Sequence, residues 1–79
     1  MNRNMKIIEQ VMQDEHPIIA EMNIRQAWIL IAYAQLGYRH PGVNPDMKAR
    51  VREAVKPFED AIVSRHPEAR KVLELGWRT

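Results

Sequence analysis

The sequence predicts an all-α protein, specifically a small helical bundle. Three observations lead to this class: apolar side chains recur at helical spacing over most of the chain, Asn44-Pro45 is typical of a helix start, and three His-Pro pairs punctuate the sequence. The pairs are His16-Pro17, His40-Pro41 and His66-Pro67. Because proline disfavours the α conformation in the residue before it, each pair indicates a helix boundary. We therefore expect one domain over residues 1–79, with three main helices and a shorter fourth.

The first helix is predicted over residues 3–15. Its apolar side chains gather on one side of the helical wheel and its polar ones on the other. The apolar stripe consists of Met5, Ile7, Ile8, Val11 and Met12. A stripe of this kind must pack against another apolar surface.

The second helix, predicted over residues 17–37, differs because its apolar residues point all round the axis. They are Trp28, Ile29, Leu30, Ile31 and Tyr33. A helix that is apolar on every side is a buried one, so we expect it to be central, enclosed by the other helices or by a second copy of the chain. A symmetric dimer built on the first two helices would achieve this, and oligomerisation is a common support for a small chain without cysteine.

The third helix is predicted over residues 45–65, with Asn44 as its N-cap and Pro45 at its first position. Pro57 lies inside this range, and an interior proline costs about 3 kcal/mol. The apolar stripe nevertheless continues in phase on both sides of Pro57, which two independent helices would have no reason to do. We interpret this as one helix kinked at Pro57. The stripe is formed by Met47, Val51, Ala54, Val55, Phe58, Ala61 and Ile62.

The fourth helix is short and predicted over residues 67–75. Gly76 is expected to end it as a left-handed C-cap, and Trp77 then stands where such a cap places an apolar residue against the preceding turn, here at Val72.

The composition excludes several classes of protein. The chain has 79 residues, a formal net charge of +2, 46% hydrophobic residues and no cysteine, as is usual for a folded soluble domain. Its longest apolar run, residues 27–34, is far shorter than the roughly 20 residues that cross a membrane. We expect a soluble, cytoplasmic protein with no membrane association.

The segment 37–45, GYRHPGVNP, is the first candidate site. Its glycines, prolines and asparagine are explained by the turn between two helices. Tyr38, Arg39 and His40 are not needed for a turn, and these residue types bind partners or anions, so they are candidate partner-binding residues. In the alternative interpretation, Tyr38 packs on the core edge and Arg39 interacts with the end of its helix.

The second candidate site is a basic ridge on the third helix, formed by Lys48, Arg52 and Lys56 at four-residue spacing. Residues 38–79 carry nine Lys and Arg against six Asp and Glu, so this half could face phosphates. Acidic residues are interleaved with the ridge, however, and a solvated face laced with salt bridges has the same pattern.

Catalytic, cofactor and metal sites are not expected. The three histidines lack the spacing of metal ligands, and apart from tyrosine the hydroxyl residues are Ser64 and Thr79. We therefore expect a non-enzymatic helical interaction module, such as an adaptor, an assembly factor or an inhibitor that occupies the surface of a protein partner. It could form a homodimer. The alternative is a nucleic-acid-binding protein that uses the basic ridge and the C-terminal arginines.

Overall fold

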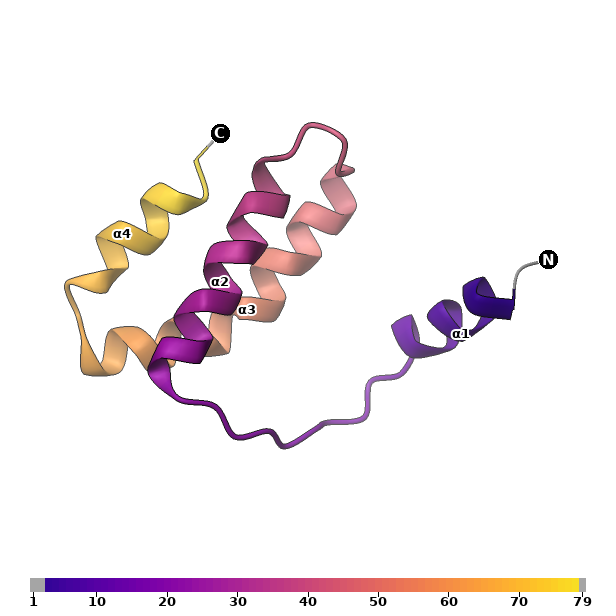
Figure 1. Cartoon of the computed structure of the whole chain (residues 1–79), viewed down its shortest axis with the longest axis horizontal. Helices are drawn as coiled ribbons and strands as arrows, with labels where there is room; N and C mark the ends of the chain where they lie inside the picture. The colour runs from indigo at the N-terminus through magenta and orange to yellow at the C-terminus, as the bar shows by residue number, and fades with distance from the viewer. Residues whose placement is uncertain (1–2, 79) are drawn as a thin grey trace.

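The computed structural model describes residues 3–78, which form four helices and no strands (Figure 1). The predicted all-α class is confirmed. The helices are α1 (Arg3–Met12), α2 (Ile24–Arg39), α3 (Pro45–Arg65) and α4 (Ala69–Gly76).

Three of the helices, α2, α3 and α4, form a bundle with one small core. The antiparallel pair α2 and α3 is joined by the loop 40–44, and α4 follows α3 closely in the chain (Figure 1). Buried side chains come from α2, from α3, and from α4 together with Trp77, which directly follows it, so the core lies where the three helices meet. The buried hydrophobic residues are Ala27, Ile31, Val55, Ile62, Leu73 and Trp77.

The remaining helix, α1, stands apart from this bundle and is connected to it by the extended segment 13–23 (Figure 1). None of its residues is buried. The chain is consequently spread out: it measures 48 × 32 × 16 Å, with a radius of gyration of 14.5 Å. A compact chain of 79 residues would have a radius of gyration of about 12 Å. We call residues 3–23 the arm.

The prediction that the second helix begins at Pro17 is wrong, because α2 begins at Ile24. The Asn23 side chain accepts a hydrogen bond from the Gln26 backbone N–H at 2.8 Å, and the Gln26 side chain accepts one from the Asn23 N–H at 2.9 Å. This reciprocal capping box satisfies two free N–H groups and fixes the start of the helix. Pro17 lies in the extended segment instead. The first helix is also shorter than predicted, ending at Met12 and not at residue 15.

The prediction that the second helix is enclosed on all sides is also wrong for the single chain. One side of α2 is buried, through Ala27, Ile31 and Gln35. The opposite side remains open because α1 does not cover it. Its large apolar residues are 47% to 71% exposed, and they are Ile29, Leu30, Tyr33 and Leu36.

The third helix matches its prediction over 45–65, running through Pro57 as one helix. Asn44 caps it by accepting a hydrogen bond from the Met47 N–H at 2.8 Å. His40 and His66 are the C-cap residues of α2 and α3, so two of the three His-Pro pairs do mark helix ends.

The two glycines near helix ends do not adopt the left-handed conformation that was expected for Gly76. No glycine within residues 3–78 has positive φ. Gly37 lies inside α2, which continues to Arg39, and Gly76 is the last residue of α4. Gly76 allows a close approach instead: a Cβ atom at this position would overlap the side-chain amide of Gln35, which would have to move.

Candidate interaction surfaces

The predicted residues Tyr38, Arg39, Lys48 and Arg52 come together around Trp77. The rings of Tyr38 and Trp77 meet edge to face, with centroids 5.1 Å apart. The Arg52 guanidinium lies over both rings, 5.9 Å from the Tyr38 centroid and 5.3 Å from that of Trp77, and the Lys48 Nζ lies 5.7 Å from the Tyr38 centroid. Cations over aromatic faces at these distances stabilise the fold. We call this group the aromatic–cation cluster.

Two further hydrogen bonds attach this corner of the bundle to α4. The Arg39 guanidinium donates to the Gly76 carbonyl oxygen at 3.2 Å, and the buried Gln35 side chain donates to the Leu73 carbonyl oxygen at 3.0 Å. Tyr38 is half-buried against the core, as its alternative interpretation stated. Arg39 contacts the end of α4, not that of its own helix.

Trp77 and Glu59 were missed by the sequence reasoning. Trp77 is only 4% exposed, and its ring packs edge to face on Tyr38. Its indole Nε1–H donates to the Glu59 carboxylate at 2.9 Å, and Glu59 is itself buried. A carboxylate in line with Val55 and Ile62 on α3 was the available signal, because these three positions share one helical face.

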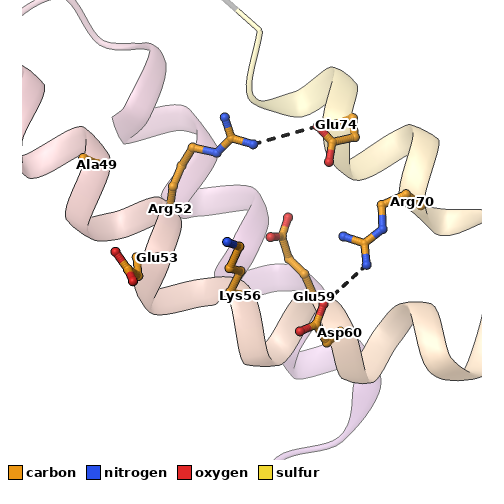
Figure 2. Close-up of a pocket in the computed structure, with 8 residues that line it drawn as sticks. All are labelled: Ala49, Arg52, Glu53, Lys56, Glu59, Asp60, Arg70 and Glu74. Atoms are coloured by element: carbon orange, nitrogen blue, oxygen red, sulfur yellow. Dashed lines mark hydrogen bonds and ion pairs between the residues drawn. The ribbon is translucent and has the colours of Figure 1, made fainter.

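Lys56 and Arg52 lie in a polar groove of about 280 Å³ between α3 and α4. Figure 2 shows two ion pairs across this groove, and each helix supplies the arginine of one pair and the carboxylate of the other. Arg52 on α3 lies 3.9 Å from the Glu74 carboxylate on α4, and Arg70 on α4 lies 3.3 Å from Asp60 on α3. Charge in the groove is mixed. Its lining residues are Ala49, Arg52, Glu53, Lys56, Glu59, Asp60, Arg70 and Glu74.

The histidines lie in three different places, and each is engaged locally. His40 Nδ1 accepts a hydrogen bond from the Gly42 N–H at 3.0 Å, which stabilises the loop after α2. His66 Nδ1 lies 3.8 Å from the Glu68 carboxylate. Within residues 3–78, no group of His, Asp and Glu side chains is arranged to hold a metal ion.

The remaining histidine, His16, makes local hydrogen bonds just after α1. Its backbone N–H donates to the Asp14 carboxylate at 2.9 Å, and its ring Nδ1 contacts the same oxygen. These hydrogen bonds, first the backbone one and then the ring one, hold the pKa of the Asp14 carboxyl below its ordinary value. They form a local turn two residues after the end of α1.

Two apolar helical faces are not covered by any other element within residues 3–78. The first is the arm stripe, formed by Met5, Ile7, Ile8, Val11 and Met12, each 50% to 65% exposed. The second is the outer face of α2, formed by Ile29, Leu30, Tyr33 and Leu36. A hollow of about 380 Å³ opens at the N-terminal end of the outer face of α2, lined by Glu21, Met22, Gln26, Ile29 and Leu30.

Comparison with known protein families, with curated proteins and with solved structures finds no match to this chain. Within residues 3–78, none of the helices has both the length and the apolar character needed to cross a membrane. The surfaces described above are therefore interpreted from their own chemistry.

Proposed function

We propose that this protein is a small, non-enzymatic interaction module that binds a protein partner through the arm stripe and the outer face of α2. A partner of matching chemistry presents an apolar helical face of similar length. Packing of one amphipathic helix on another is a common mode of protein recognition. An adaptor, an assembly factor and an inhibitor that occupies its partner's surface all work in this way.

One observation carries the proposal: apolar side chains are concentrated on the two uncovered faces. The core buries six hydrophobic residues, whereas the arm stripe and the outer face of α2 together present nine large ones at about half exposure or more. Contiguous apolar surface of this kind marks interaction sites in soluble proteins, while isolated exposed apolar residues do not.

The polar groove offers less support for a function of its own. Its arginines are directed at carboxylates across the groove, and Glu59 accepts the Trp77 hydrogen bond, so these groups already stabilise the contact between α3 and α4. We therefore assign the groove a structural role and place the working surface on α1 and α2.

Nucleic acid binding is the second candidate, favoured by the gathering of Arg39, Lys48 and Arg52 at one corner of the bundle. Lys48 and Arg52 lie over aromatic rings, however, and Arg52 also pairs with Glu74. A phosphate backbone would have to compete with these contacts. Titration of the chain into labelled RNA and DNA at two salt concentrations tests this candidate, which requires binding that weakens steeply with salt.

The protein-binding proposal is tested by a pair of variants with the same charge change. Tyr33→Glu places a carboxylate in the outer face of α2, where Tyr33 is 71% exposed, and Ala54→Glu places one at an exposed position of α3. The tagged chain is cross-linked in cells of its native host, and the captured proteins, including untagged copies of this chain, are then tested as purified binders.

We expect at least one captured protein to bind the wild-type chain and Ala54→Glu directly, and to bind Tyr33→Glu about tenfold or more weakly. Equal binding to both variants, or the lack of any direct protein binder, would refute the proposal. Measuring affinity with purified proteins excludes indirect capture as an explanation.

A further inference from the structure

We infer that the partner is a second copy of this chain, with α1 of each copy packed on the outer face of α2 of the other. The inference rests on the proposed function, because it names the occupant of the same two faces. Each copy then gives an arm and receives one, which makes a closed two-fold dimer.

The exposed area of the chain supports an extensive interface. The accessible surface is 6970 Å² for a chain of 9.3 kDa. A compact monomer of this mass exposes about 5,000 Å², so the chain has an excess of about 2,000 Å². Stable interfaces bury about 800 Å² on each partner. The excess is therefore larger than the area that a stable interface takes from each partner, and the arm contributes to it because residues 3–21 are all exposed.

The two faces match in length and chemistry. The arm stripe runs from Met5 to Met12, which span about 10 Å along α1. Residues 29–36 of α2 span about 10 Å along their helix, and the hollow at residues 21–30 extends this surface toward the N-terminal end of α2. Both faces consist of large apolar side chains, and the hollow that extends the second face is also lined by Glu21 and Gln26.

The path of the arm favours exchange, in which the arm packs on the other copy, over docking of the arm on its own bundle. The Asp14–His16 hydrogen bonds form a local turn at one end of the extended segment, and Pro17, whose φ angle is restricted, follows this turn directly. At the other end, Met22 packs against the core and Asn23 caps α2. The arm therefore already extends away from its own bundle (Figure 1). An exchanged arm keeps these contacts, whereas folding back onto its own α2 requires the short stretch between Pro17 and Met22 to reverse direction.

The extended segment itself presents two of the most exposed apolar residues. Ile18 is 88% exposed and Ile19 is 100% exposed. In an exchanged dimer, the segment crosses from one copy to the other, so these two side chains lie next to the second bundle. Their high exposure in the single chain is then explained by the absence of the second copy.

The first test is sedimentation of the purified full-length chain over a range of concentrations. We expect a dimer at micromolar concentration. Ile8→Glu in the arm stripe should raise the dimer Kd about tenfold or more, and Gln10→Glu, which adds the same charge on the opposite side of α1, should change it less than about twofold. Because α1 has no buried residue, neither variant should affect folding of the bundle.

The second test distinguishes exchange from internal docking by cross-linking. The chain has no cysteine, so Ile8→Cys and Tyr33→Cys introduce unique thiols at the centres of the two faces. Mixing the two single variants, one carrying a mass tag, with a short bis-maleimide should give a covalent dimer that joins α1 of one copy to α2 of the other.

Three results would overturn the inference. They are a monomer at high micromolar concentration, a dimer that Ile8→Glu does not weaken, and cross-linking mainly within one chain when both cysteines are placed in the same copy and treated with the same bis-maleimide. These failures are distinguishable from failure of the proposed function. A monomeric chain whose α2 face still binds another protein, with loss of binding in Tyr33→Glu, refutes exchange and leaves the interaction module intact.

Discussion

The bundle and the arm use similar amphipathic patterns in opposite ways. In the bundle, α2, α3 and α4 direct one side of each helix into a shared core that includes Ile31 and Ile62, both 1% exposed. In the arm, α1 has an equally regular stripe, and every residue of it stays open to solvent. Helical periodicity therefore identifies an apolar face, but it does not show whether another element of the same chain covers that face.

The bundle also differs from the arm in its buried polar contacts. Gln35 and Glu59 are buried, and each is hydrogen-bonded to the C-terminal part of the chain. Such contacts fix the position of α4 specifically, because buried polar groups are costly when they lose their partners. The hydrogen bonds of His16 and Asp14 in the arm are exposed and local, so they shape the chain without attaching it to the bundle.

The largest expected effect on stability comes from matched side-chain truncations, one in the bundle and one in the arm. Ile62→Ala removes a fully buried side chain and should lower the free energy of unfolding by about 2–5 kcal/mol. Ile8→Ala makes the same change in the arm, where Ile8 is 52% exposed, and should change it by less than about 0.5 kcal/mol. Urea unfolding followed by circular dichroism measures both values, in solution dilute enough to exclude association.

Equal losses from these two variants would mean that the arm is part of the cooperative unit, contrary to the comparison drawn above. If Ile62→Ala does not fold, Ile62→Val provides a milder version, with an expected loss of about 0.5–1.5 kcal/mol.

A smaller effect is expected for the two tryptophans. Trp77→Phe removes the donor to the buried Glu59 carboxylate and should cost about 1–3 kcal/mol. Trp28→Phe alters a residue that is 36% exposed and should cost less than about 1 kcal/mol. Thermal and urea unfolding by circular dichroism avoid reliance on tryptophan fluorescence. Similar costs for the two variants would show that the Trp77–Glu59 hydrogen bond adds little stability.

The smallest expected effects, of opposite sign, come from two glycines. Gly37→Ala lies in α2 with open space around the new Cβ and should stabilise the fold by up to about 1 kcal/mol. Gly76→Ala displaces the Gln35 amide from its hydrogen bond to Leu73, so despite better helix propensity it should destabilise by about 1 kcal/mol. Stabilisation by both substitutions, measured in the same unfolding assay, would contradict the close contact between α2 and α4.

Local signals predicted much of the fold correctly, and long-range contacts explain the rest. Asn44-Pro45 identified the start of α3, and the continuous stripe on both sides of Pro57 correctly indicated one helix. The prediction for the start of α2 was wrong because the capping box of Asn23 and Gln26, and not Pro17, begins this helix, although this box is visible in the sequence. The position of α1 depends on tertiary packing, which periodicity does not specify.

The candidate site follows the same division. Tyr38, Arg39, Lys48 and Arg52 do come together, since the first two end α2 and the others lie on the first half of α3. Trp77 could not be placed among them from sequence, because its contact with Tyr38 joins residues far apart in the chain. His40 and Lys56 lie outside the aromatic–cation cluster, the first in the loop and the second in the polar groove.

The way in which α4 is held has a consequence for engineering. Gln35 and Arg39 both donate hydrogen bonds to main-chain oxygens, at Leu73 and Gly76. These hydrogen bonds therefore do not depend on the identity of the exposed side chains of α4. Lys71, Val72 and Leu75 are exposed on that helix. These residues can be substituted to introduce a chosen recognition sequence, which makes α4 a suitable graft position on a scaffold of 79 residues.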